Sequence, residues 1–271
     1  MPDSYAVIGN PVAHSQSPRI HAEFARQTGQ DLVYDRLLAP SDGFVATANA
    51  FRASGGSGLN VTVPFKGEAF RLANRLSERA RAAGAVNTLK FEADTIHGDN
   101  TDGAGLVNDL TRNLRYAVAG ARVLLLGAGG AARGVIKPLL EQKPGQLTLA
   151  NRSVDKAQLL AQSFNGAFEA CGYAALAGRQ FDLVINATSA SLSGELPLLP
   201  PGVFAQSALA YDMMYGKWET PFLGLARAAG ATSLADGLGM LAEQAAESFY
   251  FWRGVRPDTT PVLKLLRQEA A

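Results

Sequence analysis

A short apolar run followed by a glycine-rich turn constrains the fold of this chain more than any other feature. The run, Val123 to Leu126, is unbroken, which is typical of a strand buried on both faces of a parallel sheet. Gly127, Gly129 and Ala132 then fit the G-x-G-x-x-A pattern, with Gly130 as an extra small residue, and apolar spacing typical of a helix follows. Strand, glycine turn and helix together predict a dinucleotide-binding unit. The alternative is an ordinary turn between strand and helix that happens to be rich in glycine.

The turn itself predicts where a pyrophosphate binds. Gly127 allows a tight turn, and Gly129 lets backbone amides approach the phosphates at the positive end of the helix. Gly130 and Ala131 complete the predicted pyrophosphate contacts.

The next predicted strand, residues 146–150, indicates which dinucleotide binds. In NAD-binding proteins an acid at the end of this strand hydrogen-bonds the ribose 2′-hydroxyl. Here the strand ends in Asn151, Arg152 and Ser153, with Lys156 close behind. A guanidinium offers a fixed charge and a fork of donors, which suits a 2′-phosphate. Asp155 is the counter-argument, but it suits the first turn of a helix. The sequence therefore predicts NADP rather than NAD.

Composition excludes several other classes of protein. The 271 residues are 47% hydrophobic and 18% charged, which is ordinary for a soluble chain. A net charge of +1 gives no reason to expect a nucleic-acid or membrane partner. The single cysteine, Cys171, excludes an internal disulfide, and no signal peptide or transmembrane run is found, so we expect a cytoplasmic protein. The three histidines are scattered, and no metal site is predicted.

Hydrophobic patterning predicts alternating strands and helices along the whole chain, an α/β protein. Ser17 and Ser41 are the predicted caps of the first two helices. Strands are expected at residues 5–9, 32–38, 59–63, 86–91, 95–98, 123–126, 146–150, 181–187 and 209–212. Later helices are expected at residues 102–114, 154–164, 221–230, 237–252 and 260–269.

Several blocks along the chain resemble the motifs of shikimate dehydrogenases. In the first half these are Asn60–Lys66, Gly84–Thr88 and Gly98–Gly103, with Gly9–Pro11 and His14–Pro18 near the start. In the second half they are Asn186–Ser189, Tyr211–Met213, Thr220–Phe222 and Asp236–Leu241. The blocks follow the family's order and cover essentially the whole chain. Any one of them taken alone has an ordinary structural explanation, such as a helix cap or a strand residue.

The resemblance implies a role for each matching residue. Lys66 and Asp102 would be the catalytic pair. The residues that would contact the substrate are Ser15, Ser17, Thr62, Asn87, Asp102, Tyr215 and Gln244. Asn151, Arg152 and Ser153 would hold the 2′-phosphate, and Thr188, Met213 and Gly237 would complete the cofactor site. These types suit the chemistry, because hydroxyls and amides bind a carboxylated polyol, and a lysine can stabilise charge on a reduced carbonyl oxygen.

The chain departs from the family pattern at two positions. Ser153 stands where many relatives have threonine, and either hydroxyl can bind a phosphate. Ser191 stands where relatives often have glycine, which leaves the shape of that loop open.

The patterning and the resemblance together predict a two-domain α/β enzyme. The resemblance implies that it reduces 3-dehydroshikimate with NADPH in aromatic amino-acid biosynthesis. The expected substrate-binding domain covers residues 1–100 and 236–271, the expected Rossmann-type NADP-binding domain covers residues 101–235, and the active-site cleft is expected between them. The expected state is a monomer or homodimer. A quinate/shikimate dehydrogenase of broader specificity is the nearest alternative. A protein that senses NADPH or a shikimate-type ligand without turnover is the alternative from another class, although it would not need both Lys66 and Asp102.

Overall fold

The structure, a computed structural model, describes residues 2–188 and 196–270. The chain divides into two compact units, each built around one six-stranded sheet. The first unit is Met1–Gly105 with Leu241–Leu265, and the second is Leu106–Met240 with Leu266–Ala271. Within the described ranges, none of the helices is long and apolar enough to cross a membrane.

The sheet of the first unit is mixed, with the strand order β2-β1-β3-β5-β6-β4. Its strands are β1 (Asp3–Gly9), β2 (Leu32–Leu38), β3 (Gly56–Val61), β4 (Arg75–Leu76), β5 (Thr88–Glu92) and β6 (Thr95–Asp99). β1 runs parallel to β2 and β3, whereas β5 runs antiparallel to β3 and β6. The β5–β6 hairpin therefore extends a parallel sheet, and its strand ends deliver residues 87 and 99–102 to one edge.

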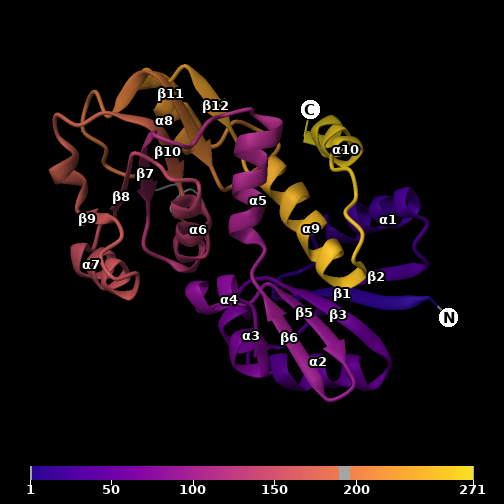
Figure 1. Cartoon of the computed structure of the whole chain (residues 1–271). Coiled ribbons are helices and arrows are strands. Elements are labelled where there is room, and N and C mark those ends of the chain that lie inside the picture. Colours follow the sequence, from indigo (N-terminus) through magenta and orange to yellow (C-terminus); the bar gives the residue numbers. More distant parts are fainter. Residues whose placement is uncertain (1, 189–195, 271) are drawn as a thin grey trace. The chain divides into compact units, whose positions relative to one another are not determined.

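Helices cover both faces of this sheet (Figure 1). They are α1 (Ser17–Thr28), α2 (Phe44–Ala53), α3 (Lys66–Leu72) and α4 (Glu78–Ala83), together with most of α9 (Leu238–Arg253). α2 and α3 cover one face, where Phe44 and Phe65 stack at 5.2 Å in a core shared with Leu59. On the other face, Phe24 of α1 meets Phe249 of α9 at 5.8 Å.

The predicted helix starts in this unit were partly wrong. Ser41 does not cap α2, which begins at Phe44 after Gly43. Ser17 is the first residue of α1 rather than its cap; Gln16 occupies the cap position and makes no side-chain capping bond. The Ser17 hydroxyl is therefore available for another role. α4 and the two-residue strand β4 were not predicted, because both are too short to show periodicity.

The sheet of the second unit is entirely parallel, with the strand order β12-β11-β10-β7-β8-β9. Its strands are β7 (Arg122–Leu126), β8 (Gln146–Ala150), β9 (Glu169–Cys171), β10 (Phe181–Asn186), β11 (Phe204–Asp212) and β12 (Ser233–Ala235). Renumbered within the unit and read from the β9 edge, this is the 3-2-1-4-5-6 order of the Rossmann fold. The predicted fold class is thus confirmed. The two short edge strands β9 and β12 were missed, and β11 begins earlier than predicted.

Helices also cover both faces of the parallel sheet. They are α6 (Gly130–Glu141), α7 (Val154–Ser163) and α8 (Pro221–Ala228), with a short 3₁₀ turn at Tyr173–Leu176. Val135 and Ile136 of α6 pack with Leu160 of α7 on one face, whereas Phe222 of α8 packs on the other. The strand residues between them are fully buried, which explains the unbroken apolar run in β7.

The chain passes from the first unit to the second within α5 (Asp102–Asn108), and α10 (Thr260–Ala270) ends the chain. The single helix predicted over residues 102–114 is instead α5 followed by a π-helical turn at Asp109–Asn113. In this turn the buried Asp109 carboxylate accepts hydrogen bonds from the hydroxyl of Tyr211 at 2.7 Å and the amide of Asn113 at 2.9 Å. These two hydrogen bonds compensate for the burial of the Asp109 carboxylate. The apolar spacing gives no reason to expect a buried acid here.

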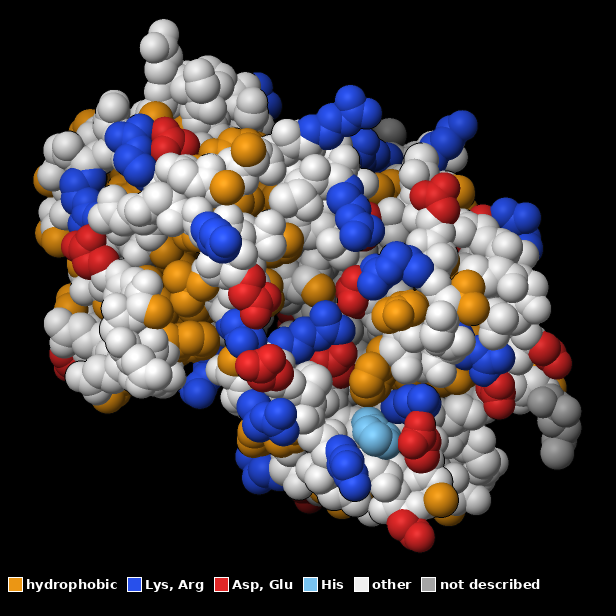
Figure 2. Space-filling view, viewed as in Figure 1, with side chains coloured by type: hydrophobic (Ala, Val, Ile, Leu, Met, Phe, Trp, Pro, Cys, Tyr) orange, Lys and Arg blue, Asp and Glu red, His pale blue; other side chains and the backbone are white. Residues whose placement is uncertain are grey.

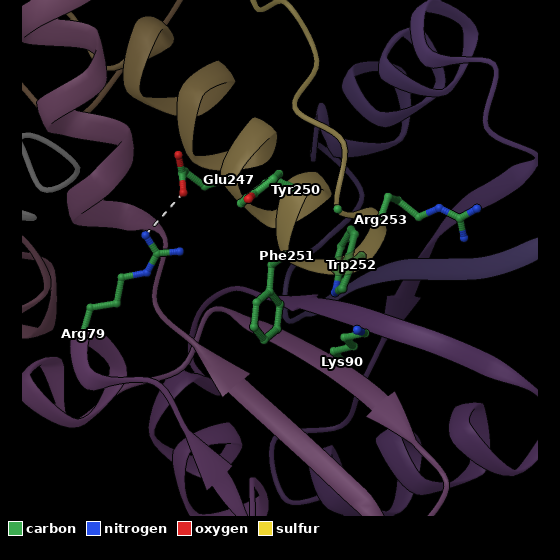
Figure 3. A pocket seen from close by; sticks show the side chains of 8 residues that line it. Arg79, Lys90, Glu247, Tyr250, Phe251, Trp252 and Arg253 are labelled. Atoms are coloured by element: carbon green, nitrogen blue, oxygen red, sulfur yellow. Dashed lines mark hydrogen bonds and ion pairs between the residues drawn. The ribbon is translucent and has the colours of Figure 1, made fainter.

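A buried ion-pair network joins α9 to the sheet of the first unit. The Arg79 guanidinium contacts Asp99 at 2.5 Å and Glu247 at 3.3 Å, and the second contact lies beside a surface pocket of about 630 Å³ (Figure 3). Burial acts to raise the pKa of Asp99, but the neighbouring Arg79 guanidinium outweighs it, so the pKa lies below the usual value of 3.8. Each cation lining this pocket has an acidic partner: Lys90 pairs with a glutamate at 2.7 Å, and Arg253 pairs with an aspartate.

The lowered pKa of Asp99 predicts a loss of stability in acid. As pH falls towards 3.8, the unfolded chain binds the proton before the folded chain does, so the free energy of unfolding decreases until pH passes the folded-state pKa. Asp99→Asn should therefore cost about 1 kcal/mol at neutral pH, since Arg79 keeps Glu247, and the cost should shrink near pH ~3. Urea denaturation at several pH values measures this. The matched control is Asp94→Asn in the exposed β5–β6 turn; an equal pH dependence in both variants would contradict the assignment.

Candidate functional site

In the second unit, the predicted cofactor residues gather at one edge of the parallel sheet. All six strands run the same way, so their carboxyl ends share an edge. Gly127 follows β7, Asn151 follows β8, Thr188 follows shortly after β10 and Met213 follows β11. Strand order reverses between β7 and β10, the switch point at which open α/β sheets bind ligands.

The glycine turn after β7 fits a pyrophosphate. Gly127 has a φ of +103°, and an added Cβ would lie only 3.0 Å from the Thr188 methyl group, so this position requires glycine. At Gly129 and Gly130, by contrast, an added Cβ would meet nothing within 4 Å. Gly129 precedes α6, whose first turn begins at Gly130 and includes Ala131. The space above these glycines and the free amides of the helix start suit an anion.

Three polar residues follow β8 in the position where a ribose phosphate would lie. The Asn151 amide donates to the carbonyl of Ser153 at 2.9 Å, which fixes the turn into α7. Arg152 and Lys156 are both exposed near the helix start. Burial raises the pKa of Tyr173, and the charge of Arg152 opposes this rise, so the guanidinium lies near that ring.

Buried polar side chains support the strand ends on the other side of the switch point. Asn186 donates to Asp212 at 3.0 Å and accepts from the Thr188 hydroxyl at 2.7 Å. Asp212 also accepts from the hydroxyl of Thr220, the cap of α8, at 2.6 Å. This network fixes the loops that carry Thr188 and Met213.

Gly237 lies directly before α9, packed on the strand end of β11. Its amide donates to the carbonyl of Met214 at 3.0 Å. A Cβ at position 237 would lie 2.8 Å from the carbonyl carbon of Met213 and closer still to the carbonyl oxygen. Close packing therefore requires glycine here and brings residues 213 and 237 together.

In the first unit, a lysine and an aspartate form an ion pair at the ends of two helices. Lys66 is the first residue of α3 and Asp102 the first residue of α5. The Lys66 ammonium lies 2.6 Å from one carboxylate oxygen of Asp102. The lysine side chain keeps one third of its surface exposed, whereas that of Asp102 is 13% exposed. The pair is thus anchored in the protein and open to solvent on its lysine side.

Asn87 and Gln244 complete this group. The Asn87 amide donates to the second oxygen of Asp102 at 2.8 Å and lies 3.5 Å from the Gln244 carbonyl oxygen. The buried Thr101 hydroxyl accepts from the same amide at 2.9 Å, and the backbone N–H of Thr101 donates to the side-chain amide oxygen of Asn87 at 2.9 Å. Asp102 therefore has a donor on each oxygen, and four of the predicted substrate or catalytic residues are in hydrogen-bonding reach of one another.

Two serines lie at the start of α1. The Ser15 hydroxyl donates to that of Ser17 at 3.1 Å. Tyr34 of β2 donates to Asn60 at 2.7 Å, and the Asn60 amide donates to the carbonyl of Asn87 at 3.3 Å. The half-buried Thr62 follows β3, held by a bond from its amide to the carbonyl of Ile8 at 3.0 Å.

Comparison with known proteins matches this chain along its whole length. A profile described as the shikimate dehydrogenase substrate binding domain matches residues 7–89. A shikimate/quinate 5-dehydrogenase profile matches residues 109–193, and a shikimate 5'-dehydrogenase C-terminal domain matches residues 237–267. A shikimate dehydrogenase (NADP(+)) of Aromatoleum aromaticum is 64% identical over 98% of both chains. The chain belongs to the shikimate dehydrogenase family.

Solved structures are also similar to this chain. The shikimate 5-dehydrogenase of Thermus thermophilus, in complex with NADP(H) and shikimate, has a TM-score of 0.87 at 31% identity, covering 99% of this chain and all of that one. The Ael1 enzyme of Pseudomonas putida has a TM-score of 0.93 at 50% identity, covering 97% of this chain and 98% of that one. Homologues of this chain are thus NADP-dependent oxidoreductases.

Two positions of the family pattern stand apart from these groups. Tyr215 lies in the exposed loop after β11, and Ser191 lies outside the described residues. Lys66 begins α3, because β3 ends at Val61, two residues before the predicted end at 63, and the chain turns before residue 66. Its ammonium is held there by Asp102, whose charge offsets the unfavourable position of a cation at a helix start.

Five residues that support this polar group by hydrogen bonds were not predicted. They are Tyr34, Asn60, Thr88, Thr101 and Ser248. Asn60, Thr88 and Thr101 lie within recognised motifs, but none of them was assigned a role. Ser248 follows Gln244 by four residues on α9, so both side chains share one helix face, a spacing that the sequence does show.

The face of the molecule drawn in Figure 2 carries charges of both signs. Figure 2 shows lysine and arginine side chains interspersed with aspartate and glutamate on one face. This agrees with the net charge of +1.

Proposed function

We propose that this chain is an NADP-dependent shikimate dehydrogenase, which interconverts 3-dehydroshikimate and shikimate. The observation that carries the proposal is the Lys66–Asp102 pair at 2.6 Å, with Asn87 and Gln244 within hydrogen-bonding reach. A protein that only senses a ligand needs polar contacts but no proton donor. A lysine held by a carboxylate, and still open to solvent, is what ketone reduction requires.

The proposed mechanism follows from the negative charge that develops on the ketone oxygen during reduction. Bound NADPH supplies a hydride, and the ketone oxygen of the substrate then gains negative charge. The Lys66 ammonium stabilises that charge and donates a proton to the oxygen. Asp102 keeps the ammonium in place, and Asn87 fixes the second oxygen of Asp102. In the oxidation of shikimate, neutral Lys66 takes the proton back.

The remaining polar residues bind the substrate. Asn87, Gln244 and Thr62 would contact ring hydroxyls, because amide and hydroxyl groups both donate and accept. Ser15 and Ser17 would hold the carboxylate, and Tyr215 would border it. In the second unit, the residues that would hold NADP are Gly127, Gly129, Gly130, Ala131, Asn151, Arg152, Ser153, Lys156, Thr188, Met213 and Gly237.

We assign substrate binding and NADP binding to separate domains. Residues 1–100 and 236–271 would bind the substrate, and residues 101–235 would bind NADP. The profile match at residues 7–89 and the Rossmann strand order support these roles. We further propose a cytoplasmic monomer or homodimer; the unpaired, buried Cys171 suits a reducing compartment.

Broader specificity is the second candidate, since one matching profile is described as a shikimate/quinate dehydrogenase. The test is the initial rate of NADP reduction with shikimate, with quinate and without substrate, followed by the absorbance of the reduced nicotinamide. We expect kcat/KM for shikimate to exceed that for quinate by at least about tenfold, because an extra ring hydroxyl must be accommodated. Comparable values would favour the broader enzyme, and no turnover with either would reject the proposed function.

A further inference from the structure

A substrate carboxylate needs a positive charge as well as hydroxyls, and the proposed carboxylate site contains a candidate that no family motif includes. Ser15 and Ser17 provide neutral donors only. Lys66 is already neutralised by Asp102 at 2.6 Å. The cation fixed to the serine segment itself is Arg36 of β2.

The Arg36 guanidinium is held on the serine segment by two hydrogen bonds. Its Nε and one Nη donate to the backbone carbonyl oxygen of Ser15, at 3.1 and 2.6 Å respectively. The same serine uses its hydroxyl to contact Ser17 at 3.1 Å. The guanidinium is therefore tied to the very residue whose hydroxyl would meet the substrate.

The pKa of Tyr34 also indicates that the Arg36 guanidinium lies near Ser17. Tyr34 and Arg36 are two residues apart on β2, so their side chains share a face of the strand. Burial raises the pKa of Tyr34, while a hydrogen bond with Ser17 and the charge of Arg36 oppose the rise. The tyrosine hydroxyl thus has Ser17 and the guanidinium as neighbours.

Arg36 is not paired with an acid within the described residues, in contrast to four other arginines of this unit. Arg26, Arg79, Arg253 and Arg256 each pair with a carboxylate. Across residues 2–188 and 196–270, no carboxylate lies within ion-pair distance of Arg36, which bonds instead to a neutral carbonyl group. Its positive charge is held in place without being neutralised.

We propose that Arg36 is a specificity-determining residue that selects substrates bearing a carboxylate. This inference rests on the proposed function, because it takes Ser15 and Ser17 as the carboxylate site. The guanidinium supplies the countercharge beside these serines and takes no part in proton transfer. Its contribution should appear in the KM for an anionic substrate and should weaken as salt screens the partly exposed charge.

The test compares shikimate with its uncharged methyl ester in three variants. Arg36→Gln keeps donors for the Ser15 carbonyl but removes the charge, whereas Arg36→Lys keeps the charge. For Arg36→Gln we expect the KM for shikimate to rise roughly three- to tenfold, with kcat and the KM for the ester nearly unchanged. Arg36→Lys should retain most of the affinity for shikimate. Arg26→Ala, an exposed arginine on α1, is the matched control and should match the wild type.

Each outcome of the KM comparison either supports or overturns the proposed role of Arg36. An equal rise in KM for acid and ester would mean that Arg36 only holds the serine segment, and an unchanged KM for both would mean that it has no role; either overturns the proposal. Shikimate binding measured by calorimetry on the same variants gives the same comparison without turnover. A wild-type chain that binds shikimate but does not oxidise it would therefore reject the proposed function while leaving Arg36 testable.

Discussion

Replacing Lys66 with methionine should lower kcat for shikimate oxidation by roughly 10²–10⁴-fold, the usual contribution of a general acid–base group. Methionine keeps most of the length of the side chain but cannot carry a proton or a charge. Because this interaction is strongest in the transition state, its loss should reduce turnover far more than binding. Shikimate affinity measured by calorimetry should change by no more than about threefold, since Ser15, Ser17 and Asn87 remain.

Lys90→Met is the matched control for this prediction. Lys90 lies on β5 of the same unit and pairs with Glu92 at 2.7 Å, away from Asp102. Its replacement should leave kcat near the wild-type value. If Lys66→Met instead abolished binding while kcat at saturation stayed high, Lys66 would be a substrate clamp, and proton transfer would have to be assigned to Asp102 or to solvent.

Arg152→Ala should weaken NADP binding by about 1.5–3 kcal/mol and leave NAD binding almost unchanged. The guanidinium follows β8 at the sheet edge that carries the other predicted cofactor residues. A charged hydrogen bond to the 2′-phosphate would be lost, and NAD lacks that phosphate. The preference for NADP over NAD should therefore fall by roughly 10- to 150-fold, measured as the ratio of the two dissociation constants.

Arg122→Ala controls for the loss of an arginine from the same unit. Arg122 begins β7, at the opposite end of the strand from the glycine turn, and pairs with Asp182 at 2.7 Å. It should not alter the preference between cofactors. Equal losses of NADP and NAD affinity in Arg152→Ala would show that the guanidinium does not contact the 2′-phosphate.

The parallel sheet of the second unit was largely predictable, because a strand that is buried on both faces consists of an unbroken run of apolar residues in the sequence. Residues 123–126 form an unbroken apolar run and became the fully buried β7. Edge strands such as β9 and β12 have three residues each, which is too short for a pattern to be recognised. Their existence depends on pairing with β8 and β11, a tertiary effect.

The polar site was predictable only where a family motif supplied the residue. Lys66, Asn87, Asp102 and Gln244 are far apart in sequence, and no local pattern joins them. The buried Ser248, which contacts neighbours of these residues, lies 2.9 Å from the Asn60 amide and 2.8 Å from the Thr88 hydroxyl. Such bonds arise from the docking of α9 on the sheet, so they become visible only once the fold has formed.

Two different roles were predicted for Ser17, and its predicted role as a helix cap was wrong. A serine before proline is typical of a helix cap, yet Ser17 is already helical and makes no capping bond. Its hydroxyl instead accepts from Ser15. The same position was thus assigned to substrate binding by its motif and to capping by its local pattern, and the structure removes the second assignment.

The central claim is tested most directly by following the hydride. The protein would be incubated with 3-dehydroshikimate and NADPH deuterated at both C4 positions of the nicotinamide, and the product would be analysed by mass spectrometry. We predict shikimate that carries one deuterium on the carbon that bore the ketone, formed rapidly by the wild type and very slowly by Lys66→Met. Unlabelled shikimate, or no shikimate at all from the wild-type protein, would contradict this account.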